Sequence, residues 1–135
     1  MMTHRPVCGL AAAAAVLCAF AAPASALDLN SYRAQHKLPH LHASSELMGA
    51  AYAHAQELAG SHRLDHDGFR ARMRNFSTAA ENVAYGCATE DCVIRMWARS
   101  AGHRRNMLMK GVTHYGIASA KGSNGQTYWV LELGN

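Results

Sequence analysis

The spacing of hydrophobic positions after residue 43 predicts the longest helix of the chain. Ser44 or Ser45 can cap its start with Glu46 in the first turn, and Gly60 ends it. Its apolar face recurs at helical spacing through Leu47, Ala50, Ala51, His54, Ala55 and Leu58. Because His54 lies on this face, we interpret it as a core histidine with one hydrogen-bond partner rather than as a ligand.

Shorter helical patterns flank this one. A helix within residues 28–38 stops before a proline, and a second helix follows Thr89, which can cap it. The apolar face of the second helix consists of Val93, Met96 and Trp97. This pattern breaks at a glycine, so we expect His103 to open a new helical turn.

The last third of the chain alternates with the period of a strand. Residues 115–120 and 127–133 each alternate, and a turn cluster at 121–125 joins them, which predicts a hairpin. Residues 81–86 read as a loop entering a short strand. Helices come early and the strand pair comes late, so the sequence predicts an α+β fold.

The first 26 residues have the composition of a signal peptide. Arg5 gives a positive start, residues 7–22 are apolar, and Ala24-Ser25-Ala26 is a small-residue cleavage site, so the mature chain should begin at Leu27. An uncleaved membrane anchor is the alternative, but about 16 apolar residues fall short of the roughly 20 that span a bilayer. We therefore expect a secreted protein, periplasmic or extracellular, with no transmembrane segment after cleavage.

Residues 27–135 have the length of one domain, which we expect to be a monomer. Without Arg5, twelve lysines and arginines stand against nine acidic residues, a formal charge of +3. Seven arginines could form a patch facing acidic lipid or wall polymer, although solvated helix faces explain them as well. They are Arg70, Arg72, Arg74, Arg95, Arg99, Arg104 and Arg105. Export argues against a nucleic-acid partner.

Cys87 and Cys92 are the two cysteines of the mature chain. An oxidising compartment makes a disulfide between them the default. A zinc or redox role has less support, because two cysteines are an incomplete zinc set and their spacing is not that of a Cys-x-x-Cys motif.

The stretch from Trp97 to Leu108 gathers rare residue types beside the glycine break. His103 and Asn106 are three residues apart and share one side of a short helix, while Met107 and Leu108 can anchor it to a core. On residue types alone, a histidine at a helix start is more often a cap or a surface group than a ligand.

Trp97, Ser100, Gly102-His103-Arg104 and Asn106-Met107-Leu108 together resemble the signature of bacterial CAP domains. This superfamily comprises cysteine-rich secretory proteins, antigen 5 and plant pathogenesis-related proteins. Other segments resemble family elements in the same order: His66, Glu81-Asn82-Val83-Ala84-Tyr85-Gly86 and Tyr128-Trp129-Val130. The resemblance implies a CAP (SCP-like) domain over residues 27–135, folded as a three-layer α-β-α sandwich.

The resemblance carries over His66 and His103 as the two cleft histidines and Glu81 as the first cleft acid. His62 is the alternative candidate for the first cleft histidine, but the family-like spacing of a leucine two residues before the histidine selects His66, which follows Leu64. Glu81 is expected at a strand edge, on the rim of the cleft. Without the resemblance, Glu81 could equally be a solvated glutamate.

Two neutral imidazoles and a carboxylate can hold a divalent ion such as zinc, and we expect weak binding through His66 and His103. If Glu81 coordinates, the set resembles a two-histidine, one-carboxylate hydrolase site in which the metal acidifies water. If Glu81 only orients a histidine, two ligands remain and catalysis loses support. Ser100 stands where many eukaryotic members have a second glutamate, which removes a negative charge beside Asn106 and His103.

Two functions from different classes stay open. The first is a secreted binding module for a lipid, cell-wall or protein ligand, since the family implies sterol, lipid and protein binding in several branches. The second is a metal-dependent, peptidase-like hydrolase that uses the same cleft. A hydrolase based on Ser100 and His103 is a third option, but no Gly-x-Ser-x-Gly elbow surrounds Ser100. Binding is preferred, because no complete metal site or nucleophile motif can be identified.

Overall fold

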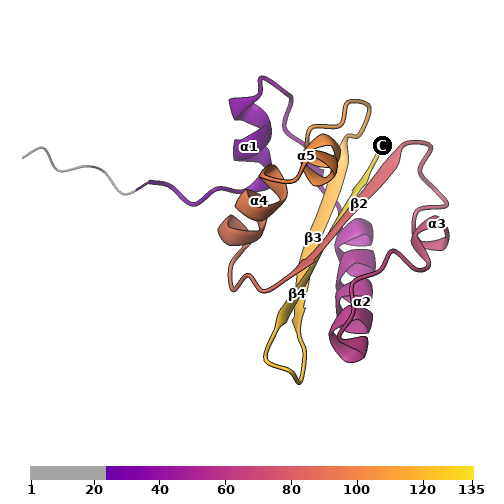
Figure 1. Cartoon of the computed structure of the whole chain (residues 1–135). Helices are drawn as coiled ribbons and strands as arrows, with labels where there is room; N and C mark the ends of the chain where they lie inside the picture. The colour runs from indigo at the N-terminus through magenta and orange to yellow at the C-terminus, as the bar shows by residue number, and fades with distance from the viewer. Residues whose placement is uncertain (1–23) are drawn as a thin grey trace, which may run out of the picture.

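The computed structural model describes residues 24–135 (Figure 1), so most of the predicted signal peptide lies outside the described residues. The elements are α1 (Leu29–Gln35), β1 (His42–Ala43), α2 (Ser45–Ser61), α3 (Phe69–Arg72), β2 (Ala79–Tyr85), α4 (Glu90–Ala98), α5 (Ala101–Met107), β3 (His114–Lys121) and β4 (Thr127–Gly134). Helices and strands both contribute, as the α+β class requires.

The strands form one sheet in the order β1-β3-β4-β2. β3 and β4 pair antiparallel, from His114 opposite Gly134 to Lys121 opposite Thr127, which confirms the predicted hairpin. β2 pairs antiparallel with the other side of β4, while β1 runs parallel to the start of β3. β2 is therefore an edge strand.

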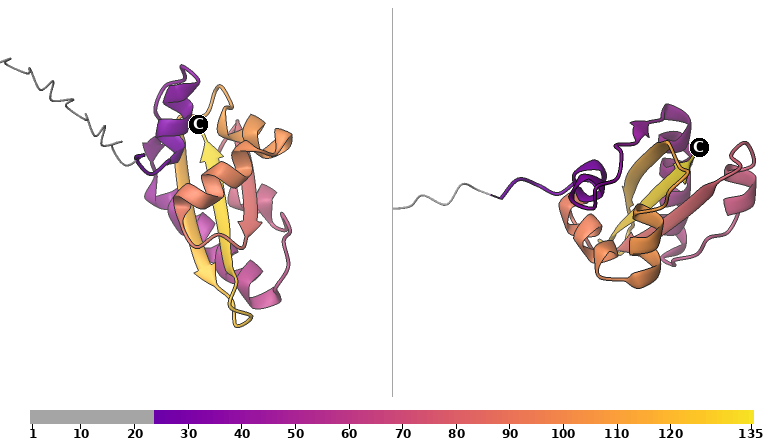
Figure 2. Two further views of the ribbon diagram at one scale, coloured as in Figure 1. Left: turned by 60° about the vertical axis from the view of Figure 1, so that its left-hand side comes forward. Right: turned by 90° about the horizontal axis from the view of Figure 1, so that it is seen from above.

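Helices cover both faces of this sheet (Figure 2). α2 packs across β3 and β4 on one face, and α1, α4 and α5 lie over the other. The two faces of β4 accordingly bury different side chains. Trp129, Leu131 and Leu133 join the core under α1 and α4, and Tyr128 and Val130 join the core under α2. This alternation confirms the three-layer arrangement.

α2 approaches β3 very closely at Gly116. A Cβ atom at this position would lie 2.2 Å from the carbonyl carbon of Leu47 and 2.2 Å from the backbone nitrogen of Met48. Only a residue without a side chain permits that distance. Gly116 therefore sets how closely the helix lies on the sheet.

Side-chain caps begin three helices, two of them at positions that the sequence predicts, Ser44 and Thr89. The side chains of Asp28, Ser44 and Thr89 each accept a hydrogen bond from the backbone N–H three residues later, at 2.7, 3.2 and 3.3 Å. The end of α2 differs from the prediction. The helix continues through Gly60 to Ser61, and His62 closes it with a left-handed φ of 56°.

Cys87 and Cys92 form a disulfide, with their Cα atoms 5.5 Å apart. The predicted pairing is confirmed. The bridge closes the connection between β2 and α4, and so fixes where α4 leaves the sheet.

The packed structure begins at Leu27. Ala24, Ser25 and Ala26 are exposed, whereas Leu27 is buried in the core under α1 and α4. The backbone N–H of Leu27 also donates to Oδ1 of Asp91 at 2.6 Å. Within residues 24–135, no helix combines the length and the apolar character needed to cross a membrane.

Candidate functional site

Two hollows are bordered by the same three segments of the chain, and we refer to them together as the cleft. The loop before α3, the strand β2 and the region of α5 border both hollows. The first, of about 270 Å³, is lined by His66, Phe69, Ala79, Ala80, Glu81, Asn106 and Met109. The second, of about 260 Å³, is lined by Leu64, Val83, Ala84, Tyr85, Met96, Trp97, Ser100 and His103. All five candidate residues line the cleft, although His66 and His103 belong to different hollows.

Glu81 is buried in the cleft, with 2% of its side chain exposed, rather than placed on the rim. Its Oε1 accepts a hydrogen bond from Nδ1 of His66 at 2.6 Å, and the His66 side chain is 57% exposed. A carboxylate on Nδ1 holds the hydrogen on that nitrogen and leaves Nε2 as the free electron-pair donor. Glu81 would therefore act on a bound ligand only indirectly, by orienting the imidazole of His66.

Arg72 and Glu132 complete a buried charge cluster around Glu81. Nη2 of Arg72 donates to Oε2 of Glu81, and its Nε donates to Oε1 of Glu132 at 3.0 Å. Glu132 lies directly opposite Glu81 in the pairing of β2 with β4. The sequence analysis identified neither Arg72 nor Glu132 as a site residue. It listed Arg72 only among seven arginines that could form a basic patch or lie on solvent-exposed helix faces. One signal was present: Glu132 is a lone acid within the apolar stretch of β4.

The two glutamates have pKa values shifted in opposite directions. Burial and the neighbouring Glu81 carboxylate raise the pKa of Glu132 to about 9, against the opposing effect of Arg72. Burial would also raise the pKa of Glu81, but its interactions with Glu132, Arg72 and His66 outweigh burial and lower that pKa. At neutral pH Glu132 is a neutral acid and Glu81 a carboxylate, so Arg72 faces one negative charge.

His54 lies beneath this cluster, and 1% of its side chain is exposed. It has two hydrogen-bond partners where one was expected from the sequence. Nδ1 lies 3.0 Å from Oε2 of Glu57, and Nε2 lies 3.0 Å from the carbonyl oxygen of Asp65. Both partners are hydrogen-bond acceptors. The core interpretation of His54 holds, and its second bond ties α2 to the loop that carries His66.

Asn106 and Asn82 join α5 to β2. Nδ2 of Asn106 donates to the carbonyl oxygen of Glu81 at 3.2 Å and to Oδ1 of Asn82 at 2.9 Å. Nδ2 of Asn82 in turn donates to the carbonyl oxygen of His103 at 3.0 Å. Asn82 therefore holds the backbone of His103, and Asn106 ties α5 to Asn82 and to the backbone of Glu81.

The imidazole of His103 packs toward Trp97, with ring centroids 6.4 Å apart. Burial and then the charge of His66 lower the pKa of His103, so its ring is neutral at pH 7. A neutral imidazole can act as a metal ligand or a hydrogen-bond acceptor.

Ser100 occupies the N-cap position of α5, but its side chain makes no capping hydrogen bond. It lines the second hollow with His103, and no hydrogen bond joins the two side chains in the described part of the chain. The structure therefore gives no Ser–His pair of the kind that activates a serine nucleophile.

The side chains of the cleft can be compared with the needs of a divalent ion. Within residues 24–135, no group of three or more His, Cys, Asp or Glu side chains is arranged to hold a metal ion. Both oxygens of Glu81 are engaged, one by His66 and one by Arg72. Nε2 of His66 and the ring of His103 are the remaining histidine nitrogens in the lining of the two hollows. Of the two alternatives for Glu81, the geometry favours orientation of His66.

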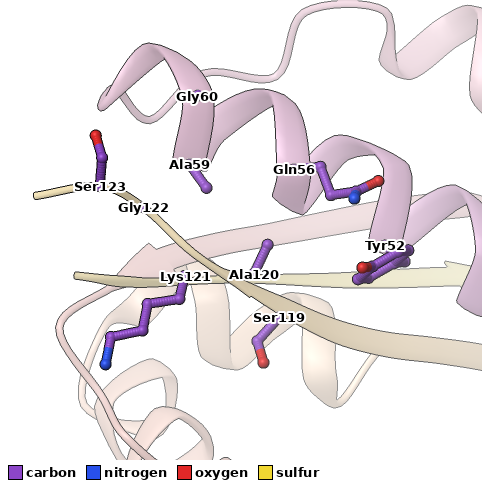
Figure 3. A pocket seen from close by; sticks show the side chains of 9 residues that line it. All are labelled: Tyr52, Gln56, Ala59, Gly60, Ser119, Ala120, Lys121, Gly122 and Ser123. Atoms are coloured by element: carbon purple, nitrogen blue, oxygen red, sulfur yellow. The ribbon is translucent and has the colours of Figure 1, made fainter. Parts of the chain in front are cut away.

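A third hollow, of about 520 Å³, shares no lining residue with the cleft. It lies between α2 and the end of β3 with the turn that follows (Figure 3). Tyr52 and Gln56 reach into it from α2, while Ala120 points toward the helix and Lys121 away from it. Small and polar residues make up most of its lining, and Lys121 is its charged member. This hollow lacks the histidines and carboxylates of the cleft.

The chain resembles known proteins in sequence and in fold. The model of the cysteine-rich secretory protein (CAP) family matches residues 28–133. YkwD of Bacillus subtilis strain 168 is 30% identical over 97 residues, which cover 65% of this chain and 38% of that protein. This chain thus matches well under half the length of that relative.

Two solved structures share the fold. An outer surface protein of Borrelia burgdorferi superposes with a TM-score of 0.71 at 20% identity, over 79% of this chain and 86% of that one. An extracellular SCP-domain protein of Bacillus anthracis gives a TM-score of 0.69 at 22% identity, over 79% of this chain and 37% of that one. Because the family match spans nearly all of the described residues, this chain belongs to the CAP family of cysteine-rich secretory proteins.

Proposed function

We propose that this protein is an exported binding module whose cleft holds a ligand with an apolar body and a polar group. The observation that carries this proposal is the state of Glu81. It is the single carboxylate among the described residues that line the cleft, and His66 and Arg72 engage both of its oxygens. No free carboxylate is left to activate a water molecule, which favours binding over hydrolysis.

The lining of the cleft suits a lipid, a cell-wall component or an apolar protein segment. Leu64 and Tyr85 border the second hollow and are 41% and 52% exposed. Exposed large apolar side chains beside a hollow are typical of ligand sites. The imidazoles of His66 and His103 would hydrogen-bond the polar group of the ligand. The proposal that the protein is exported is supported by the signal-peptide composition of residues 1–26.

A divalent ion such as zinc would be held by Nε2 of His66 and the ring of His103, with Glu81 orienting His66. The ion would supply a positive contact for the polar group of the ligand. Two protein ligands are fewer than catalytic and structural zinc sites use, so the ion would exchange readily.

Fluorescence titration tests this proposal, because Trp97 is buried and lines the second hollow. Residues 27–135 would be titrated with phosphatidylglycerol vesicles, soluble peptidoglycan fragments and an unstructured peptide library. We expect saturable binding of one class, weakened by His103→Ala and unchanged by Lys121→Ala. Cleavage of the peptide library that stops with a chelator would instead establish the hydrolase, and the absence of both binding and cleavage would remove the proposal.

A further inference from the structure

A separate pocket lies where the segment after α1 meets β1 and the connection between α5 and β3. We call it the basic pocket. Its volume is about 480 Å³, which is within the range of small-molecule sites. It shares no lining residue with the two hollows of the cleft. A ligand here would therefore be independent of the function proposed for the cleft.

Arg33 places a buried positive charge in the wall of this pocket. The residue is 2% exposed. Its Nε donates to the carbonyl oxygen of Pro39, and its Nη1 donates to those of Met107 and Met109, each at 3.0 Å. Nη2 bonds none of the described residues, and no carboxylate among them pairs with the guanidinium. Arginine stays protonated in proteins, so the charge persists without a counter-charge.

Further cationic groups stand around the pocket. Lys37 and Lys110 line it together with His40 and His42, and no aspartate or glutamate does so. Neither lysine forms an ion pair with a described residue. The side chains of Leu38, Leu41 and Val112 supply apolar wall between these charges. A pocket that combines positive charge with apolar wall favours a ligand that carries both a negative charge and an apolar part.

We propose that the basic pocket binds a small organic oxyanion, a carboxylate or phosphate group carried on a short apolar body. Three backbone carbonyl oxygens accept hydrogen bonds from Arg33, and an oxyanion would add the opposite charge that this guanidinium lacks. Guanidinium groups favour carboxylate and phosphate oxygens because their N–H groups match the geometry of these anions. Lys37 and Lys110 add attraction from the rim, while Leu38 and Val112 receive the apolar body.

Calorimetric titration of residues 27–135 separates the contributions of charge and apolar body. Octanoate and octyl phosphate carry both features, inorganic phosphate carries only the charge, and octanol carries only the apolar body. We expect one or both octyl anions to bind more tightly than phosphate and octanol, and the tighter anion identifies the head group. Equal binding of octanol and the octyl anions, or no binding of any probe, would overturn the proposal.

Variants and chemical-shift mapping locate the site. Lys37→Gln and Lys110→Gln should each weaken binding by roughly 3- to 5-fold, the effect of one exposed ion pair. Lys121→Gln makes the same change of charge away from this pocket and should leave the affinity unchanged. Backbone amide shifts should move at Leu41 and Val112. Shifts confined to the cleft, or equal affinities for all three variants and wild type, would contradict the assignment.

Discussion

Glu132→Gln should remove a loss of stability that the wild-type protein shows as the pH rises above neutrality. The pKa of Glu132 is raised to about 9 in the folded protein, while a glutamate in an unfolded chain titrates near 4.3. A group whose pKa rises on folding contributes stability that is complete below the unfolded pKa and is lost as the pH rises through the folded pKa. Glutamine keeps an acceptor for Arg72 and an N–H donor in place of the carboxylic O–H, but it does not titrate.

The size of the effect follows from the shift. Each pH unit between the two pKa values changes the free energy of unfolding by up to about 1.4 kcal/mol. Between pH 7 and pH 8.5 the wild type should therefore lose up to about 2 kcal/mol relative to the variant. Glu81 and His103 do not change in this window. Their pKa values are lowered on folding, so their contributions are lost only as the pH falls through the folded values.

Thermal unfolding of both proteins from pH 6 to pH 8.5 measures the difference. One kcal/mol corresponds to roughly 4 to 8 °C in Tm for a domain of this size. Glu46→Gln is the matched control, because Glu46 is an exposed glutamate in the first turn of α2 and should follow the wild-type curve. Parallel curves for the wild type and Glu132→Gln would show that Glu132 is ionised in the folded protein, which would refute the neutral acid inferred above.

Three further predictions concern packing, the disulfide and the metal. Gly116→Ala should destabilise the domain by about 3 kcal/mol or prevent folding, because the added Cβ would meet the backbone of α2. Urea denaturation measures the free energy of unfolding, and a decrease of less than about 1 kcal/mol would contradict this prediction. Replacing both disulfide cysteines with serine should cost about 2 kcal/mol, and wild type in reductant should show the same loss. Zinc should bind weakly and less tightly in mild acid, because protons compete with the ion for the imidazoles. His66→Ala and His103→Ala should each reduce calorimetric uptake, whereas equal uptake would place the ion elsewhere.

The sequence was sufficient for features that depend on neighbouring residues. The alternation around Trp129 identified the hairpin, and the helical spacing from Leu47 to Leu58 identified α2. The sequence left the cap of α2 open between Ser44 and Ser45, and the structure shows that it is Ser44. The family resemblance then selected His66, Glu81 and His103 from a chain with nine histidines. Each of these inferences needed only a short window or a motif.

Contacts between segments far apart in the sequence could not be predicted from the sequence. Arg72, Glu81 and Glu132 meet because an edge strand, its neighbour and a short helix converge, and no local pattern encodes that meeting. The same reason explains the second partner of His54 and the carbonyl oxygens that surround Arg33. Register between β2 and β4 decides which charges face one another, and a single-residue slip would move every side chain to the other face.

The backbone nitrogen of Leu27 occupies a position where a free amino terminus would be stabilised. Cleavage after Ala26, the predicted processing step, would convert this amide into an ammonium group beside Oδ1 of Asp91, which now accepts its hydrogen bond at 2.6 Å. Hydrogen bonds from Arg95 and then from Leu27 lower the pKa of Asp91, so it is a carboxylate at neutral pH. Processing would remove only exposed residues from the described part of the chain, and it would replace a neutral hydrogen bond with an ion pair that ties the new terminus to the first turn of α4.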